Sequence, residues 1–569
     1  MPTHHTPVHL AAAEAVAARA GVAATDLKVE APPRAELGDL AVGCFAIAKA
    51  QKKNPAQVAQ EIAAAITPHG PIASATATGP FVNFRLDRTQ TYRWLVDAAL
   101  RGTLVPGQVG AGKTICIDYS SPNISKHLAY HHIRGTTIGH SLAQIFRALG
   151  YRVVGINFLG DWGATHGMVI AAYERWGAEE PLDVTKLNEL YVRFREEAKN
   201  NPILEQEARN TFKRLEDGDP HIRALWQRFR DISWAEFEEI YKLLGIEFDE
   251  IRGESAYEPD MPRVFEELRP LLEESEGALV VPLEGEKTPI LLKTKDGTTL
   301  YATRDVAAAE YRWNTYHFDR SLYVVDRGQA LHFRQLFKLL LKAGHTWATR
   351  CEHVPYGLIK VGGKRSATRL GGVVLMRDVF RIAEADVREV IAKVNPNLPP
   401  DVVDDVAPKI GIGAVVFANL ATQRDKDIDF DLDKAISLEG DSGPYVQYSH
   451  ARCASIARKA GETITSIEGV DFGKLAHDAE WEVAKKLLEF PDIVVRAADN
   501  SEPHGVAHYL LQLAGDFSRW YTLGNSDPSL RVLVDDPDVR RARLALVAAV
   551  QAVLATGLSL LGIAAPEQM

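Results

Sequence analysis

The chain has 569 residues, of which 46% are hydrophobic and 25% are charged, and its formal net charge at pH 7 is −10. A chain of this length is too long for a single hydrophobic core, so we expect three or more domains. The composition is that of a soluble globular protein. The negative net charge argues against indiscriminate binding to polyanions, although it leaves room for a local basic face.

The cysteines and the apolar stretches narrow the class of protein further. Cys44, Cys116, Cys351 and Cys453 are scattered singly, with no Cys-x-x-Cys pair. We therefore expect no disulfide framework, no zinc and no other metal site, and a cytoplasmic location. The N-terminus lacks the pattern of a signal peptide, and polar residues interrupt the apolar stretch 544–561, which predicts a packed helix rather than a membrane span.

Residues 1–107 are predicted to be an N-terminal α+β domain. An alanine-rich helical stretch opens it, and residues 79–86 (Gly-Pro-Phe-Val-Asn-Phe-Arg-Leu) are typical of a strand near its end. The glycine and proline residues of segment 106–110 predict a linker to the next domain.

Residues 108–404 are predicted to be an α/β domain of the Rossmann type with inserted segments. Residues 114–119 and 152–158 predict strands, and apolar residues between them recur at helical spacing until Gly150, where a left-handed helix cap is expected. A strand, a helix and a strand in this order indicate a βαβ unit of a parallel sheet. Residues 405–569 are nearly all helical in pattern, which predicts an all-α domain.

The turn after the first strand of the α/β domain is a candidate nucleotide site. Lys126 follows the turn Ser120-Ser121-Pro122-Asn123, and His127, His131 and His132 are expected on the first turns of the helix. Ligands bind beyond the carboxyl ends of parallel strands, and a helix N-terminus favours phosphate. A lysine and imidazoles there suit a nucleoside triphosphate, while a histidine-rich surface helix is the plain alternative.

Several long motifs, in order along nearly the whole chain, resemble those of class I arginyl-tRNA synthetases. The likeness covers residues 120–167, with Ser-Pro-Asn-Ile-x-Lys and Leu-Gly-Asp-Trp-Gly, and segments 252–255, 301–307, 440–448 and 560–569. The resemblance implies activation of arginine by ATP with Mg²⁺ to arginyl-adenylate, followed by transfer to the 2′-hydroxyl of the terminal adenosine of tRNA(Arg). It also implies that arginine activation requires bound tRNA, and that residues 1–107 contact the outer corner of the tRNA.

The resemblance implies which residues bind ATP and which take part in catalysis. The catalytic residues it implies are Lys126, His131, His132, Lys364 and Arg369. The ATP-binding residues it implies are Lys126, His132, Gly160, Asp161, Lys364 and Ser366. The glycines and cations of segment 362–372 suit a loop that closes over pyrophosphate, whereas an exposed basic turn is the alternative.

The resemblance also implies an arginine pocket and a tRNA-binding face. The pocket residues are Asp118, Asn123, Glu254, Tyr301, Asp305 and Gln329. Carboxylates accept the five N–H donors of a guanidinium with good geometry, although Asp305 alone would be interpreted as an ordinary charge at a helix start. The tRNA-binding residues are Tyr445, Tyr448, Arg452, Tyr521 and Met569. Two aromatics and an arginine on one helical face suit stacking on unpaired bases, and a packed core stripe is the alternative.

The chain departs from the family in its first signature, His-x-Gly-His. The aligned residues are Ala129, Tyr130, His131 and His132, so the first histidine is absent and a histidine replaces the glycine. In the second signature Ala367 replaces the usual lysine, and Lys126 matches a lysine thought to compensate.

Two alternatives stay open beside the synthetase. A paralogue could make arginyl-adenylate for another acceptor, and it should then have lost the Tyr445, Tyr448 and Arg452 face. A catalytically inactive RNA-binding scaffold should have relaxed the pocket, where Glu254 and Asp305 are present. We expect a monomer that binds no membrane.

Overall fold

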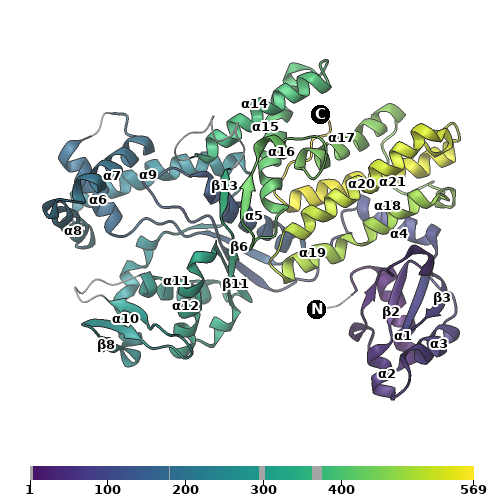
Figure 1. The fold of residues 1–569 in the computed structure, drawn as a ribbon, viewed down its shortest axis with the longest axis horizontal. Helices are drawn as coiled ribbons and strands as arrows, with labels where there is room; N and C mark the ends of the chain where they lie inside the picture. Colours follow the sequence, from purple (N-terminus) through teal and green to yellow (C-terminus); the bar gives the residue numbers. More distant parts are fainter. Residues whose placement is uncertain (1–3, 178–179, 294–300, 362–373) are drawn as a thin grey trace.

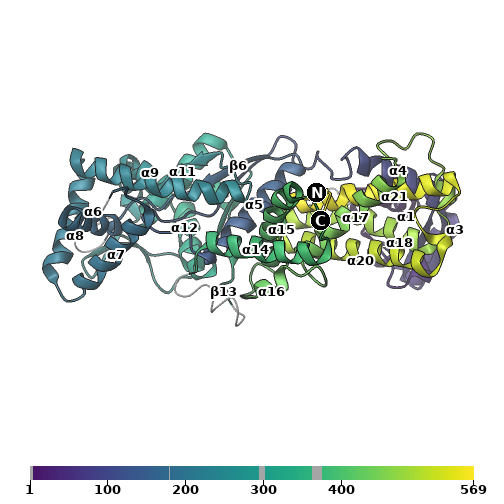
Figure 2. The same ribbon diagram turned by 90° about the horizontal axis from the view of Figure 1, so that it is seen from above.

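The computed structural model describes residues 4–177, 180–293, 301–361 and 374–569, with all their side chains except those of Tyr301 and Val361. The chain folds into an elongated molecule (Figures 1 and 2). A small sheet domain and the C-terminal helices share one end, a parallel sheet lies in the middle, and inserted helices form the other end. The predicted fold class, a Rossmann-type domain with insertions between an α+β and an all-α domain, is confirmed.

The N-terminal region is a four-stranded antiparallel sheet with strand order β1-β2-β4-β3. In β4, Val82, Phe84 and Leu86 alternate along the strand and are buried beneath helices that pack on the sheet. The elements are α1 (Pro7–Ala20), η1 (Ala24–Asp26), β1 (Val29–Glu30), η2 (Ala35–Leu37), β2 (Leu40–Gly43), α2 (Phe45–Gln51), α3 (Pro55–Ala65), β3 (Ile72–Thr78) and β4 (Phe81–Leu86).

Helix α4 (Arg88–Leu100) belongs by its packing to the C-terminal helices, although the sequence places it in the first domain. Arg88 Nη2 lies 2.7 Å from Asp478 Oδ1, and the ring of Tyr92 packs edge-on against Trp481. Trp481 Nε1 also donates to Asp39 Oδ1 of the small sheet domain over 2.8 Å. These contacts join the first hundred residues to the C-terminal helices. They lie beside a cleft of about 960 Å³.

A five-stranded, fully parallel sheet forms the centre of the molecule, with strand order β12-β11-β5-β6-β7. Strands that follow β6 and β7 along the chain return to the other side of β5, so the switch point of the sheet lies between β5 and β11. Ligands of doubly wound sheets bind at this point, beyond the carboxyl ends of the strands. The strands are β5 (Thr114–Asp118), β6 (Arg152–Asn157), β7 (Glu250–Ile251), β11 (Arg320–Asp326) and β12 (Cys351–Tyr356).

The predicted βαβ unit is β5, α5 (Ile133–Ala148) and β6. Gly139 lets α5 approach the chain after β5 closely, because a Cβ atom there would lie 2.2 Å from Cβ of Tyr119. Gly150 has φ of 84°, the left-handed conformation that the sequence predicts at the helix end.

Two insertions interrupt the sheet. Between β6 and β7, a helical arm comprises α6 (Ala164–Trp176), α7 (Val184–Ala198), α8 (Pro202–Glu216) and α9 (Pro220–Leu243) (Figure 1). Asp183, Asn201 and Asp219 cap the last three helices by accepting backbone hydrogen bonds.

The second insertion, between β7 and β11, contains a small antiparallel sheet and several helices. Its elements are η4 (Glu254–Asp260), α10 (Met261–Leu268), η5 (Arg269–Leu271), β8 (Glu273–Ser275), β9 (Ala278–Val281), β10 (Ile290–Lys293) and α11 (Tyr301–Tyr316). On the other side of β11 lie η6 (Arg327–Gln329), α12 (Ala330–Lys342) and η7 (Thr346–Arg350).

The C-terminal region is helical, and its helices begin before residue 405. Residue 404, the expected end of the Rossmann-type domain, lies inside α15, which packs along α14, so the chain has no linker there. The elements are β13 (Ile359–Val361), α14 (Met376–Val394), α15 (Pro400–Leu420), β14 (Ile428–Phe430), α16 (Leu432–Ala435), α17 (Gly443–Ala460), η8 (Phe472–Lys474), α18 (Asp478–Leu488), α19 (Phe490–Asp499), α20 (His504–Ser526), η9 (Pro528–Leu530) and α21 (Pro537–Leu560).

Helix α21 is the one helix of the described residues that is long and apolar enough to cross a membrane by length and composition. In the structure 67% of its most apolar window is buried, and it packs against α4, α17 and α20. The prediction of a packed helix for this stretch is therefore confirmed.

Candidate active site

The loops that follow β5 and β6 are joined directly at the switch point. Asn123 and Gly160 form a parallel bridge, in which Gly160 N donates to Pro122 O over 2.9 Å and Ile124 N donates to Gly160 O over 3.1 Å. A Cβ atom at residue 160 would lie 2.2 Å from Asn123 Oδ1, so this approach requires glycine. The Asn123 side chain is exposed. The structure thus brings these two predicted site residues together.

The helix after this loop starts later than the sequence predicts. Its first turn is the 3₁₀ turn η3 (Tyr130–His132), followed by α5, and His127 lies in the loop before it. Nδ1 of His127 lies 2.6 Å from Glu236 Oε1 of α9, and Ser125 N donates to Ser233 Oγ of the same helix. The expectation that His127 lies on the helix was wrong, because these contacts with the inserted arm hold the loop away from helical geometry.

His131 and His132 lie together on the 3₁₀ turn, with ring centroids 4.1 Å apart. Nδ1 of His132 lies 3.0 Å from the Ala129 carbonyl oxygen, which can only accept, so Nδ1 carries the proton. Burial, with the nearby His131 and Lys126, lowers the pKa of His132 to about 4. The neutral imidazole then has an unprotonated Nε2, and an anion close to it would favour proton uptake.

Lys126 connects the loop to the inserted arm. Its Nζ lies 4.7 Å from the ring centre of Tyr191 on α7, a cation–π contact. The buried His166 on α6 lies within electrostatic reach of this lysine: burial, followed by Lys126 and Arg304, lowers the pKa of His166 to about 4. His166 and Arg304 were missed by the sequence analysis.

The two carboxylates expected to bind a guanidinium come from separate elements, η4 and α11, and influence each other electrostatically. Burial raises the pKa of Glu254 to about 8; the nearby Arg304 opposes the rise, and the negative charge of Asp305 adds to it. Arg304 Nη1 lies 3.7 Å from Glu254 Oε2. Within the described part of the chain no hydrogen-bond donor meets this buried Oε2. An added cation would therefore be favourable at this position.

Asp305 also has a partner that the sequence analysis missed. Its Oδ2 lies 2.6 Å from Nε2 of His332 on α12. Burial of His332 opposes its charged form, but the hydrogen bond to Asp305 and the charge of that carboxylate outweigh burial, and the pKa of His332 is raised. His332 follows Gln329 by three residues, so the helical spacing behind a predicted pocket residue was the available signal.

Asp118 and Asp161, which the resemblance assigns to substrate contacts, also have partners within the protein. Asp118 Oδ2 lies 2.7 Å from Nη2 of the buried Arg312, and its Oδ1 accepts from Ser121 Oγ over 2.8 Å. Asp161 is fully buried and accepts from Ser255 N and Oγ and from Arg230 Nε. All four carboxylate oxygens thus have a partner within the protein, and a carboxylate oxygen can accept a further hydrogen bond.

Of the remaining expected residues, Gln329 is the one whose side chain the structure describes. Gln329 is exposed in η6 after β11. Lys364, Ser366, Arg369 and the Tyr301 side chain are outside the description. The chain just after the 362–373 segment is fixed beside the first signature, since Tyr130 N donates to Val374 O over 2.8 Å.

Four of the five residues expected to bind tRNA line one groove of about 260 Å³ on the C-terminal helices. The guanidinium of Arg452 lies over two rings, 4.7 Å from the centre of Tyr448 and 5.1 Å from that of Tyr521. Met569 lines the same groove, and Asn395 Nδ2 donates to its backbone oxygen over 3.3 Å. Tyr445, half-buried one turn earlier on α17, does not line it.

A doubly wound parallel sheet with a loop pair at its switch point, two half-buried carboxylates from separate elements and a helical C-terminal domain are the features expected of a class I aminoacyl-tRNA synthetase. Three family models match the chain in order: the arginyl tRNA synthetase N terminal domain over residues 8–86, the catalytic domain of class I (R) tRNA synthetases over 96–432, and the DALR anticodon binding domain over 446–569.

Curated relatives and solved structures agree with these matches. The chain is 43% identical to the arginine–tRNA ligase of Clostridium perfringens and 44% identical to that of Exiguobacterium sibiricum, each over 549 residues, 95% of this chain, and over 96% and 95% of the relatives. The arginyl-tRNA synthetase structure from Thermus thermophilus superposes with a TM-score of 0.83 at 27% identity, covering 99% of this chain and 100% of that one. The chain belongs to the arginyl-tRNA synthetase family.

Proposed function

We propose that the protein activates arginine with MgATP to arginyl-adenylate and transfers the arginyl group to the terminal 2′-hydroxyl of tRNA(Arg). The observation that carries the proposal is the pocket of Glu254 and Asp305, two carboxylates from separate elements beside the Asn123–Gly160 loop pair. In the first step the arginine carboxylate attacks the α-phosphate and releases pyrophosphate. In the second step the hydroxyl attacks the adenylate and releases AMP.

The pocket suits a guanidinium better than an ammonium. Glu254 and Asp305 approach from η4 and α11, so a planar group with five donors can reach both, whereas an ammonium is a compact point charge. A buried carboxylate that loses its partner costs several kcal/mol, which is enough to reject lysine without a separate editing site. We assign Asn123 to the amino-acid end of the substrate and Gln329 and Tyr301 to the pocket rim.

For the nucleotide we assign Lys126, His131 and His132 to the phosphates, and the backbone of Gly160 to the adjacent wall. We also assign Lys364, Ser366 and Arg369, which lie outside the described residues, to the pyrophosphate. The support is the attachment of residues 374–376 to the first signature. The reaction needs no covalent enzyme intermediate and no zinc, so catalysis rests on positioning and charge stabilisation.

For the tRNA we assign the groove of Tyr448, Arg452, Tyr521 and Met569, with Tyr445 at its edge, to the anticodon loop. Stacking of unpaired bases on aromatic rings and on a guanidinium plane is a common mode of RNA recognition. We further propose three functional regions, 1–107, 108–404 and 405–569, with the first contacting the outer corner of the tRNA. The protein is proposed to act as a cytoplasmic monomer without a membrane.

The test is ATP–pyrophosphate exchange by the purified protein with arginine, ATP and tRNA(Arg), each omitted in turn. Exchange is expected only with all three present, together with charging of tRNA(Arg) and with no exchange when lysine replaces arginine. Exchange that proceeds without tRNA, with no charging, would support an adenylate-forming paralogue. A protein that binds tRNA and exchanges nothing would support a scaffold.

A further inference from the structure

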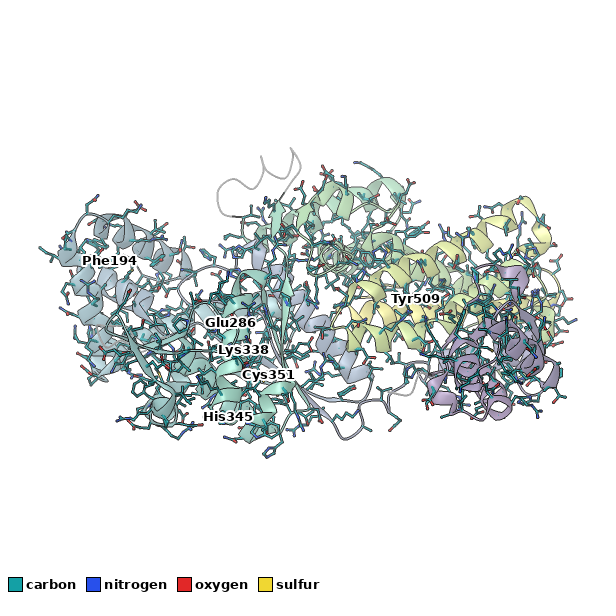
Figure 3. All side chains as sticks on the ribbon, turned by 60° about the horizontal axis from the view of Figure 1, so that its bottom comes forward. Phe194, Glu286, Lys338, His345, Cys351 and Tyr509 are labelled. Carbon is teal, nitrogen blue, oxygen red and sulfur yellow. The ribbon has the colours of Figure 1, made fainter. Side chains whose placement is uncertain are left out.

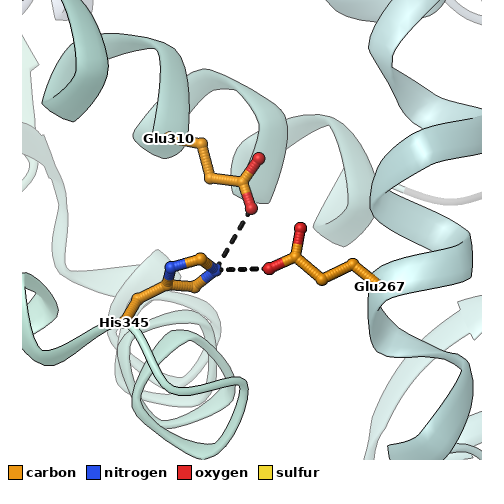
Figure 4. A group of neighbouring side chains, drawn as sticks. All are labelled: Glu267, Glu310 and His345. Atoms are coloured by element: carbon orange, nitrogen blue, oxygen red, sulfur yellow. Dashed lines mark ion pairs between the residues drawn. The ribbon is translucent and has the colours of Figure 1, made fainter.

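Three side chains far apart in the sequence converge on one point away from the proposed active site (Figure 4). They are Glu267 on α10, Glu310 on α11 and His345 in the turn after α12. His345 Nε2 lies 2.8 Å from Glu267 Oε1 and 3.1 Å from Glu310 Oε1, and the three potential ligand atoms all lie within 4.8 Å of one another. In Figure 3, His345 lies on the lobe that carries Glu286 and Lys338, far from Tyr509 of the C-terminal helices.

The outer oxygens of both carboxylates are held by a single guanidinium. Arg263 Nη1 lies 3.1 Å from Glu267 Oε2, and its Nη2 lies 2.5 Å from Glu310 Oε2. This leaves one oxygen of each carboxylate directed at the imidazole. Metal-binding carboxylates are commonly oriented in this way, by hydrogen bonds to the oxygen that does not bind the metal.

The atoms at the centre of the cluster lack hydrogen bonds despite their proximity. Glu310 is 4% exposed, and among the residues that the structure describes neither its Oε1 nor His345 Nε2 makes a contact with hydrogen-bond geometry. Buried polar atoms in this state are costly unless another group satisfies them.

We propose that Glu267, Glu310 and His345 form a binding site for a divalent transition-metal ion. One imidazole nitrogen and two carboxylate oxygens are a ligand set that suits ions such as Zn²⁺, at bond lengths of about 2.0–2.2 Å. The Glu267 side chain is 32% exposed, which gives the ion an entry path and leaves room for water as a further ligand. The Trp347 ring, 5.2 Å from that of His345, covers the imidazole.

The expectation of no metal site rested on isolated cysteines, and this site uses none. Its ligands lie on three elements that are far apart in the sequence, so no short sequence motif predicts the site. The bound ion would join α10 and α11 to the end of α12. Because α11 carries Asp305 and α12 carries His332, the ion would stabilise the framework of the proposed arginine pocket without touching it.

The test is metal binding by the full-length protein after removal of metals with a chelator. Zn²⁺ titration by calorimetry and Co²⁺ titration by visible absorption are expected to give one equivalent of tight binding, with an increase in Tm. His345→Gln should remove this equivalent, and Glu267→Gln, a change at the exposed rim, should weaken it at least about tenfold. Circular dichroism of both variants checks that they are folded.

His221→Gln is the matched control. His221 Nε2 lies 3.2 Å from Glu174 Oε1, and Arg214 lies close to the same carboxylate, but this pair has a single carboxylate. The variant should bind Zn²⁺ and Co²⁺ like the unmodified protein. Two results would overturn the proposal. One is that His345→Gln binds as much metal as the unmodified protein, and the other is that His221→Gln loses the same equivalent of metal.

Discussion

Asp305 Oδ2 and His332 Nε2 are 2.6 Å apart and connect α11 to α12 at the edge of the proposed arginine pocket. The contact holds one carboxylate oxygen in place and leaves the other for a substrate. Because His332 is more basic than an unperturbed histidine, the pair is most strongly bound when the imidazole is charged. His332 is therefore a positioning residue that acts through Asp305.

We expect His332→Gln to raise the KM for arginine about tenfold and to change kcat much less. A hydrogen bond to a charged group contributes about 1.5–3 kcal/mol, and glutamine restores only a neutral donor. Steady-state charging kinetics separate the two constants. His508→Gln is the control, since its imidazole contacts a backbone carbonyl oxygen and the ring of His504 on the C-terminal helices. A fall in kcat with unchanged KM would assign His332 to another role.

Arginine binding should release a proton, because burial raises the pKa of Glu254 to about 8. A guanidinium favours the ionised carboxylate, so the Kd for arginine is expected to fall by up to about tenfold per pH unit between pH 6 and 8 and to level off above. Calorimetry in buffers of different ionisation enthalpy measures the proton release, which Glu254→Gln should abolish. A Kd independent of pH in this range would place Glu254 outside the pocket.

The same carboxyl makes the free protein less stable at higher pH. The pKa of Glu254 is about 8 in the folded protein and 4.5 in the unfolded chain. The contribution of this carboxyl to stability is therefore fully present below pH 4.5 and is lost as the pH rises through about 8. Bound arginine should restore this loss. Its protection against thermal unfolding is therefore expected to be larger at pH 8.5 than at pH 6.

A substitution in the groove on the C-terminal helices is expected to impair the use of tRNA and not the use of arginine or ATP. Tyr448→Ala should raise the KM for tRNA(Arg) about tenfold to a hundredfold, since a stacked base contributes about 1–3 kcal/mol. At saturating tRNA the exchange rate with arginine and ATP should be close to normal. Unchanged tRNA affinity with a lower Tm would instead identify Tyr448 as part of the core, packed against Arg452.

The altered first signature predicts an active enzyme that uses Lys126 and His132. Lys126→Ala and His132→Ala should each lower turnover at least about tenfold, because loss of one charge-stabilising donor commonly costs about 10²–10³. Lys213→Ala is the control, since that exposed lysine pairs with Asp217 on the helical arm. We also expect lower turnover for His131→Gly, whose ring packs beside His132. Tighter ATP binding in this variant would show that His131 only crowds the nucleotide.

The sequence predicts local features of this fold well and distant pairings poorly. The strands at 114–119 and 152–158 and the helix end at Gly150 follow from patterns within a few residues. By contrast, the helix start was misplaced at His127 because Glu236, on an inserted helix, binds its imidazole. Such a contact depends on tertiary packing that no local pattern encodes.

The candidate site shows the same division. The resemblance assigned Asn123 and Gly160 to the site without their pairing, and it placed Glu254 and Asp305 in one pocket. Asp118 was expected to meet substrate, and the sequence analysis missed its partner Arg312, whose guanidinium also lies over two aromatic rings. An acidic residue at a strand end has the same sequence pattern whether its partner is a ligand or a buried arginine.

The most direct test of the account is the kcat/KM for arginine of Asp305→Asn, measured by tRNA charging. Removing one partner of a desolvated charge pair costs about 3–5 kcal/mol, so a loss of several hundredfold or more is expected, with tRNA affinity nearly unchanged. Asp433→Asn, a change on the surface helix α16, should behave like the unmodified protein. A near-normal kcat/KM for Asp305→Asn would contradict the account, because the guanidinium of arginine would then have another binding site.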